Sequence, residues 1–266
     1  MPKIRVGEID IYYERGGDTN LPRLLYISGT GGDLRLKPRA LDGMWPRHFD
    51  VLVFDQRGLG RSNKPDHPYT MAHYADDAAG LMRAIGWKSA RVVGFSFGGM
   101  VAQELVLRHP AMVERLVLAC TSPGGAGGAS YPLHEIQHLS ADERAKLVLR
   151  LSDTRHDDAW ALAHPDEYRT LTQPVIDPFA NEPGRALGAR RQLEARAQHN
   201  AWDRLPQISC PTLIAGGRYD GIALPETQAK MAQRIPAAKL EMFEGGHGVM
   251  IQDARMVPAI IAFLES

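Results

Sequence analysis

Short apolar runs and helical segments alternate through the first 120 residues of the chain. The apolar runs, rich in Val, Leu and Ile, occupy residues 23–28, 51–55, 91–95 and 116–120. Because they are apolar at nearly every position, they predict strands that are buried on both faces of a sheet. Helical periodicity over residues 70–85 and 98–109 supplies the crossover connections that parallel strands require. The pattern predicts an α/β fold with a mostly parallel, doubly wound sheet, and residues 3–15 predict a hairpin at its edge.

The pattern changes after Cys120 and returns about 80 residues later. Residues 121–129 are mostly small and predict a linker that is a candidate hinge, whereas residues 133–200 carry amphipathic helical stretches. Strands are then predicted at residues 211–217 and 239–243, and helices at residues 225–234 and 256–264. We therefore expect an α/β core formed by residues 1–122 and 206–266, with a helical cap inserted at residues 123–205.

Composition and charge narrow the classes of partner. The 266 residues are 44% hydrophobic and carry 31 Lys and Arg against 31 Asp and Glu, so the formal charge is zero. A neutral chain lacks the cationic field that nucleic acid or an anionic membrane would require. The first residues lack an apolar export signal, and no segment approaches the roughly 18 apolar residues of a membrane span. We expect a cytoplasmic protein without nucleic-acid or membrane partners, in which Cys120 and Cys210 are buried thiols.

Residues 94–98 read Gly-Phe-Ser-Phe-Gly, the G-x-S-x-G pattern of a nucleophile elbow. By itself this short pattern has little weight, but its context fits. An apolar strand runs into it, a helical segment follows it, and glycines flank the serine where the turn brings the backbone close to its neighbours. Ser96 is therefore the candidate nucleophile.

A serine hydroxyl needs a base and a group that orients the base. Asp220 follows the strand predicted at residues 211–217, and His247, in Gly-Gly-His-Gly, follows the strand predicted at residues 239–243. Both side chains are expected at the carboxyl ends of parallel strands, the edge where Ser96 is expected as well. The chain order Ser, Asp, His is the order that the elbow architecture uses. These three residues form a candidate catalytic triad.

On these motifs the chain resembles the α/β-hydrolase fold family over nearly its whole length. The matching segments are the elbow, Asp-Gln-Arg-Gly-Leu-Gly-Arg-Ser at residues 55–62, Gly-Gly-Arg-Tyr-Asp at residues 216–220 and Gly-Gly-His at residues 245–247. The resemblance implies that the inserted segment caps the site. It also implies an oxyanion hole formed by the backbone N–H groups of Thr30 and Phe97, with Ser28 at the position where similar proteins have histidine. Asp55, Arg57 and Ser62 are expected to be structural.

Two other motifs suggest different chemistry. Gly29-Thr-Gly31 follows a strand as in a dinucleotide-binding fingerprint, but Leu34 replaces the last glycine and Pro38 interrupts the expected helix. His134-Glu-Ile-Gln-His138 is a literal H-E-x-x-H zinc motif. Its third ligand at the metzincin spacing would be Arg144, so we expect an exposed helical face instead. We expect no cofactor and no metal.

The resemblance and the candidate triad together favour a serine hydrolase that cleaves small to medium carboxylic esters through an acyl-enzyme. A lactonase, a carbon–carbon bond hydrolase, a perhydrolase or an acyltransferase would use the same triad, and a non-enzymatic ligand receptor on the same fold stays open. Serine at the elbow excludes the relatives that use an aspartate nucleophile. The apolar cap residues Trp160, Leu162, Tyr168 and Phe179 either line the pocket or hold the cap helices together. The partner expected is a small ester, and the protein is expected to be a monomer or a homodimer.

Overall fold

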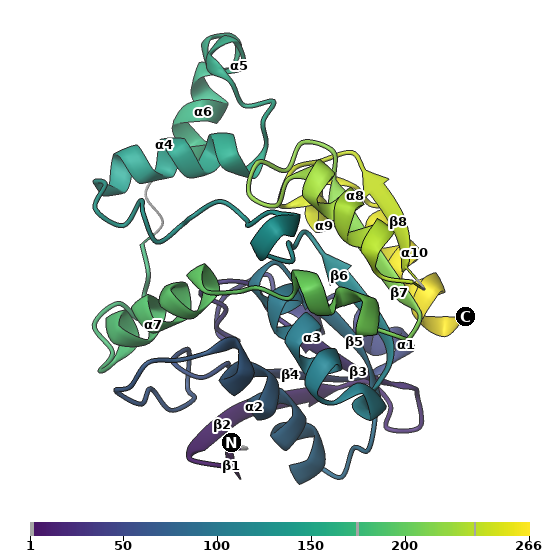
Figure 1. The fold of residues 1–266 in the computed structure, drawn as a ribbon. Coiled ribbons are helices and arrows are strands. Elements are labelled where there is room, and N and C mark those ends of the chain that lie inside the picture. Colours follow the sequence, from purple (N-terminus) through teal and green to yellow (C-terminus); the bar gives the residue numbers. More distant parts are fainter. Residues whose placement is uncertain (1–2, 174–175, 237) are drawn as a thin grey trace.

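The computed structural model describes residues 3–173, 176–236 and 238–266, and Figure 1 shows one eight-stranded sheet at its centre. The strand order is β1-β2-β4-β3-β5-β6-β7-β8. Strands β1 and β2 form an antiparallel hairpin, β2 pairs antiparallel with β4, and all other neighbours are parallel. The strands are β1 (Lys3–Val6), β2 (Ile9–Gly16), β3 (Arg23–Ile27), β4 (Asp50–Phe54), β5 (Ala90–Phe95), β6 (Val113–Ala119), β7 (Thr212–Gly217) and β8 (Ala238–Phe243).

The sheet confirms the predicted α/β fold. Strands β4 and β7 are buried at every position, and β6 is buried from Leu116 to its end, as their continuous apolar sequences indicated. The run predicted at residues 116–120 begins earlier, at Val113, because the chain joins the sheet directly after a short 3-10 turn. In register, Phe95 lies beside Ala119 and Gly217 beside Phe243. The carboxyl ends of β5, β6, β7 and β8 therefore lie along one edge of the sheet.

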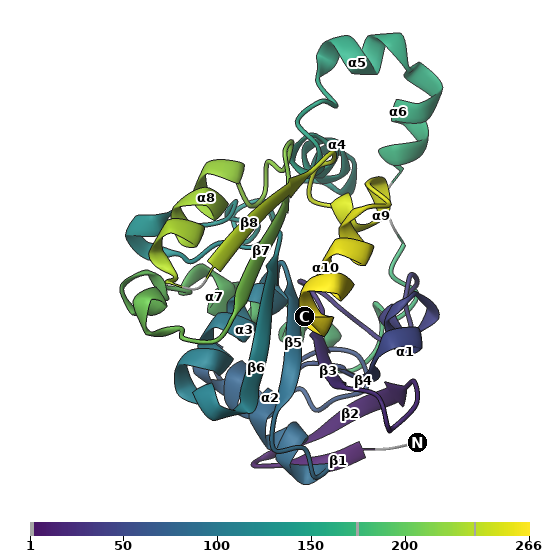
Figure 2. The same cartoon turned by 90° about the vertical axis from the view of Figure 1, so that its right-hand side faces the viewer.

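Helices cover both faces of the sheet, but unequally (Figure 2). Helices α2 (Met71–Ala84), α3 (Phe97–Arg108) and α8 (Pro225–Arg234) pack on one face. The other face carries α1 (Trp45–His48), which has four residues, together with α9 (Val249–Gln252) and α10 (Met256–Glu265). Short 3-10 turns complete the core: η1 (Ala40–Asp42), η2 (Pro110–Met112), η3 (Gly125–Gly127) and η4 (Trp202–Gln207).

Between β6 and β7, the described part of the chain forms four α-helices: α4 (Ala141–Ser152), α5 (Asp158–Ala163), α6 (Pro165–Leu171) and α7 (Arg185–Ala197). Helix α4 begins with a capping box in which Ser140 and Glu143 bond each other's backbone N–H groups. Helices α5 and α6 project away from the sheet in Figure 1. The helices appear where the cap was predicted, and the division at residues 123–205 stays a prediction. Among the described residues, no helix has the length and apolar character needed to cross a bilayer.

Candidate active site

Ser96 occupies the sharp turn between β5 and α3. Its backbone φ is 53°, in the left-handed region that residues other than glycine rarely adopt. The flanking glycines are required by space, since a Cβ at Gly94 would lie 2.4 Å from the carbonyl oxygen of Gly98, and one at Gly98 would lie 2.1 Å from that of Ile27. The glycines of the G-x-S-x-G pattern thus permit a turn that presents Ser96 at the sheet edge.

The elbow is anchored to strand β6 beside it. The Ser96 N–H donates to the carbonyl of Ala119 at 2.8 Å, and the Thr121 hydroxyl donates to the carbonyl of Ser96 at 2.8 Å. Ser96 keeps 7% of its surface exposed. Both backbone groups of the strained residue are therefore held by the sheet, which fixes the direction of its hydroxyl-bearing side chain.

The structure brings all three candidate triad residues together. His247 Nε2 lies 2.9 Å from Ser96 Oγ, and His247 Nδ1 lies 2.8 Å from Asp220 Oδ2. The second carboxylate oxygen of Asp220 accepts the N–H groups of Ile222 and Ala223, each at 2.8 Å. One oxygen is thus fixed by the backbone, which aims the other at the imidazole. This is the geometry that converts a hydroxyl into a nucleophile.

A neutral thiol lies beside the buried carboxylate of Asp220. Burial, and then the charge of Asp220, raise the pKa of Cys120 well above its usual value. The thiol therefore stays protonated and adds no second negative charge next to the Asp220 carboxylate. The other cysteine, Cys210, is only half-buried, so the prediction of two buried thiols holds for Cys120 alone; both are free.

The candidate oxyanion-hole amides lie on two segments that pack against each other at the elbow. Phe97 is the first residue of α3, so its N–H has no partner within the helix. The loop that follows β3 is pressed against the elbow, because a Cβ on Gly29 would lie 3.4 Å from the Ser96 Cβ. The carbonyl of Ser28 accepts the Gln56 side-chain amide at 2.9 Å, which holds this loop without the histidine of similar proteins. The role of Thr30 and Phe97 stays a prediction.

A glutamine that the sequence did not single out reaches the same loop from the cap. Gln192, on α7, is fully buried, and its Oε1 accepts the N–H of Gly31 at 2.8 Å. Gly31 directly follows the candidate amide of Thr30. Helix α7 therefore contacts the loop after β3 (residues 28–34, the oxyanion loop) through the side chain of Gln192, in addition to the ion pair between Arg185 and Asp33. No pattern could have indicated this, because a polar residue on an amphipathic helix predicts exposure.

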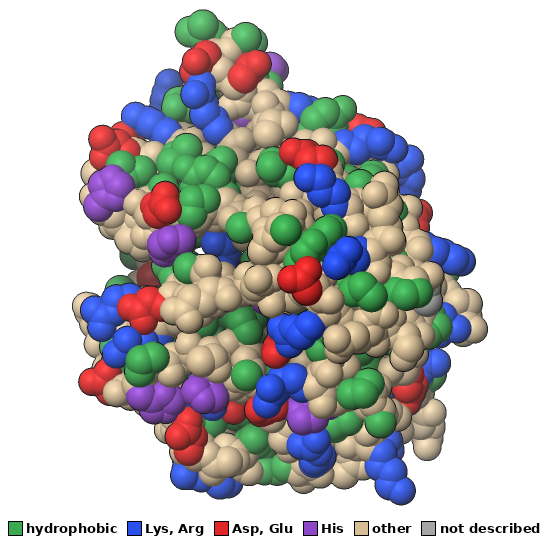
Figure 3. All heavy atoms as spheres, in the orientation of Figure 1, with side chains coloured by type: hydrophobic (Ala, Val, Ile, Leu, Met, Phe, Trp, Pro, Cys, Tyr) green, Lys and Arg blue, Asp and Glu red, His purple; other side chains and the backbone are tan. Residues whose placement is uncertain are grey.

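The end of cap helix α4 holds the loops that carry the other two triad residues. The carbonyl of Ser152 accepts the His247 N–H at 2.5 Å, and that of Leu151 accepts the Gly221 N–H at 2.9 Å. These are carbonyls of the last helical turn, which lack helical partners and form the negative end of the helix dipole. In the space-filling view of Figure 3, a hollow at the left edge of the molecule lies between the surface over α4 and the surface over α7.

The residues expected to be structural make structural contacts. The Asp55 carboxylate accepts the N–H groups of Leu34 at 2.7 Å and Arg61 at 2.8 Å. Burial raises the pKa of Asp55, and those backbone bonds oppose the rise. Ser62 donates to the Asp55 carbonyl, and Arg57 pairs with the buried Asp77 at 2.7 Å. These contacts hold the loop after β4 together and join it to the loop after β3 and to α2.

The segment containing the zinc motif is not a helix. Residues 133–138 form turns, so the predicted helix is wrong, whereas His134 and His138 are exposed as expected. The next helix, α4, begins only at Ala141, where Ser140 and Glu143 form its capping box. Across the three described ranges, no group of three or more His, Cys, Asp or Glu side chains is arranged to hold a metal ion.

The cap aromatics face several environments. Trp160 packs between the rings of His156 and His164, and Leu162 is 84% exposed. Phe179 lies 3.5 Å beneath the guanidinium of Arg35. Trp160 and Phe179 thus hold the cap together or join it to the core.

Comparisons with known proteins agree on the fold. A family model described as the alpha/beta hydrolase fold matches residues 22–254. A poly(3-hydroxyalkanoate) depolymerase from Ectopseudomonas oleovorans is 28% identical over 262 residues, covering 94% of this chain and 87% of that protein. A Caulobacter vibrioides (strain NA1000 / CB15N) protein, named provisionally as the carbamate hydrolase RutD, is 30% identical over 285 residues, covering 100% and 99%. The enol-lactonase of Burkholderia xenovorans LB400 has a similar fold, with a TM-score of 0.79, 24% identity and full coverage of both chains.

Proposed function

The chain belongs to the α/β-hydrolase fold family, and from that premise we propose that it is a serine hydrolase that cleaves carboxylic esters through an acyl-enzyme. The observation that carries the proposal is the unbroken hydrogen-bond series from Ser96 through His247 to Asp220, at 2.9 and 2.8 Å. The chemistry of an ester fits this set of groups, because a hydroxyl, a base and two backbone donors are what acyl transfer requires.

In the first half-reaction, Ser96 Oγ attacks the ester carbonyl while His247 Nε2 takes its proton. Asp220 holds the imidazole in the tautomer with hydrogen on Nδ1 and stabilises the imidazolium that forms. The developing oxyanion is stabilised by the N–H groups of Thr30 and Phe97. His247 then gives the proton to the leaving alcohol, which departs and leaves the acyl group on Ser96.

In the second half-reaction, water takes the place of the alcohol. His247 removes a proton from the water, the resulting hydroxide attacks the acyl carbonyl, and the same two amides hold the second oxyanion. When this intermediate collapses, His247 returns the proton to Ser96 Oγ, and the carboxylic acid leaves. The acyl group therefore has to stay bound through both steps, whereas the alcohol has to leave early.

Two further observations favour an ester over the other substrates of the same triad. The depolymerase that this chain resembles is named for poly(3-hydroxyalkanoate), a polymer joined by ester bonds. Moreover, the large pocket next to the triad residues is mostly apolar, which suits a weakly polar ester. A lactone is an internal ester that the same steps would open, and the carbamate named for the other relative is a second alternative.

The proposal is tested by covalent labelling followed by turnover. A fluorophosphonate probe is expected to modify the wild-type protein at Ser96, located by peptide mass spectrometry, and to leave Ser96→Ala unmodified. A panel of p-nitrophenyl esters, lactones and aryl carbamates then compares the substrate classes on both proteins. Lack of labelling would indicate a ligand-binding protein, and full ester hydrolysis by Ser96→Ala would exclude the mechanism.

A further inference from the structure

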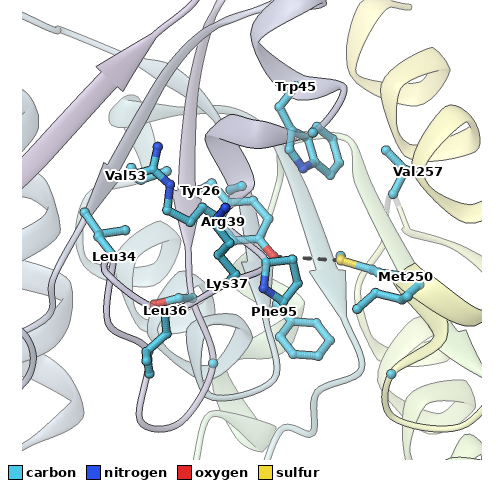
Figure 4. Close-up of a pocket in the computed structure, with 18 of the residues that line it drawn as sticks. Tyr26, Leu34, Leu36, Lys37, Arg39, Trp45, Val53, Phe95, Met250 and Val257 are labelled. Atoms are coloured by element: carbon cyan, nitrogen blue, oxygen red, sulfur yellow. Dashed lines mark hydrogen bonds between the residues drawn. The ribbon is translucent and has the colours of Figure 1, made fainter. Parts of the chain in front are cut away.

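A large cavity lies on the less covered face of the sheet, directly behind the candidate nucleophile. Its volume is about 590 Å³, within the range of small-molecule sites. The chain between β3 and β4 forms one wall, and α9 with the start of α10 forms the other (Figure 4). Many of its lining side chains are apolar or aromatic, among them Tyr26, Leu34, Trp45, Phe95, Met250 and Val257, and the charged residues Asp33, Lys37 and Arg39 line it as well.

The cavity exists because a long connection folds into little helix. Between β3 and β4 the chain forms only the turn η1 and the four-residue α1, whereas long helices cover the opposite face. Figure 2 shows α1 and α10 standing apart on this side of the sheet. Pro38, in a segment without regular structure, lines the space that a longer helix would fill.

The wall of the cavity nearest the sheet edge is shared with the candidate active site. Gly29 and Thr30 line it, and Gly29 lies against Ser96 as described above. Phe95, the residue before the nucleophile, lines it too, and its ring centre lies 5.4 Å from that of His247. Gly248, directly after the histidine, completes this wall. A carbonyl held at Ser96 and Thr30 would therefore have one substituent at the cavity.

Two of the three charged side chains that line the cavity are engaged with protein partners, and the third, Lys37, is exposed to solvent. Asp33 is paired with Arg35 and Arg185, and Arg39 is paired with Asp42 and Glu14. Deep in the cavity, the Tyr26 hydroxyl donates to the Met250 sulfur at 3.8 Å, as the dashed line in Figure 4 marks. Burial raises the pKa of Tyr26, so the phenol stays neutral. The interior thus favours an uncharged chain over a carboxylate-bearing one.

We infer that this cavity binds the apolar acyl chain of the substrate, which makes the protein selective for medium-chain acyl esters. The inference rests on the proposed function and adds the substrate class to it. The acyl group occupies the cavity because it has to remain bound between the two half-reactions, and a site walled by Phe95 and the oxyanion loop retains it. The alcohol leaves on the side of His247 Nε2.

The test is a chain-length series of p-nitrophenyl esters from acetate to decanoate, on wild type and on variants of both walls. Each buried methylene is expected to raise kcat/KM about fourfold until the cavity is full. Val257→Phe on α10 and Ala40→Leu on η1 each fill the cavity, so the octanoate-to-acetate ratio of kcat/KM is expected to fall about tenfold or more. Val257→Ala is expected to shift the optimum to longer chains.

The matched control is Ala262→Phe, which adds an aromatic ring on the exposed side of α10 and is expected to keep the wild-type ratio. Thermal unfolding shows whether each variant is folded. A flat wild-type series, or a ratio that neither wall variant changes, would overturn the inference. So would a series of alkyl acetates that responds to Val257→Phe while the acyl series does not. In each case, labelling of Ser96 and acetate turnover report on the proposed function separately.

Discussion

The turns at the sheet edge and the contacts of the cap differ in how they hold the candidate triad. At the edge, Ser96, Asp220 and His247 follow strands β5, β7 and β8, so the order and register of parallel strands bring them together. Backbone hydrogen bonds then fix the orientation of the side chains, as they do for the Asp220 carboxylate. The strand that each residue follows decides where it lies, which is why Ser96 and His247 meet although 151 positions separate them in the sequence.

The cap, by contrast, reaches the site through a few individual groups. The carbonyls of Leu151 and Ser152 hold two triad loops, and the side chain of Gln192 holds the oxyanion loop. Arg196, one turn further along α7, is buried without an acidic partner and donates to Ser130 and Tyr131; burial lowers its pKa to about 10. The cap therefore contacts the core through individual polar groups, whereas the positions of the edge turns follow from the order of the strands in the sheet.

The largest effect is expected from Asp220→Asn, which acts on the edge turns alone. The amide oxygen can still accept the N–H groups of Ile222 and Ala223, but its NH₂ group would face His247 Nδ1 and favour the wrong tautomer. We expect kcat to fall on the order of 10⁴-fold, with little loss of stability. Asp55→Asn is the control, because this buried carboxylate is expected to affect unfolding and leave kcat nearly unchanged. Equal kinetic losses in both variants would contradict the distinction.

The second-largest effect tests whether the nucleophile elbow requires glycine because a side chain would clash with the neighbouring backbone. Gly98→Ala would place a methyl group 2.1 Å from the Ile27 carbonyl oxygen, where the buried first turn of α3 packs against the end of β3 and neither backbone can move far. We expect the free energy of unfolding to fall by about 3 kcal/mol. Gly43→Ala meets only an ordinary contact at 3.5 Å and is expected to unfold like the wild type. Urea unfolding measures both, and comparable stabilities would show that the elbow tolerates bulk.

The difference between the edge turns and the cap contacts also explains which parts of the structure could be predicted from the sequence. Continuous apolar runs and a strand–turn–helix context sufficed for the sheet, the elbow and the order of the triad, because these depend on local pattern and topology. The contacts of Gln192 and of the carbonyls at the end of α4 depend on how one helix docks on another segment, which no periodicity encodes. The turns at residues 133–138 were missed because a spacing typical of helices does not ensure a helix.

A moderate effect is expected from Gln192→Leu, which removes the cap contact nearest to the candidate amide of Thr30. The Gly31 N–H would lose its acceptor, so the neighbouring amide of Thr30 would be less well positioned for the oxyanion. We expect kcat to fall about tenfold with KM nearly unchanged, since the contact matters most in the transition state. Arg190→Leu, at an exposed site on the same helix, is the control. A change in KM alone would assign Gln192 to substrate binding instead.

The smallest effect concerns the ionic contact between the cap and the loop after β3. Burial alone would raise the pKa of Asp33, but hydrogen bonds from Arg35 and Arg185 outweigh it and lower the pKa to about 2. Because the folded pKa lies below the unfolded value of 3.8, this stabilisation is complete above about pH 5 and is lost as the pH falls towards 2. The difference in unfolding free energy between wild type and Asp33→Asn is therefore expected to shrink by about 1 kcal/mol between pH 6 and pH 3. Denaturant unfolding at both pH values measures it. A difference that stays constant with pH would mean that the Asp33 carboxylate contributes through packing, and that the cap is held here by shape instead of charge.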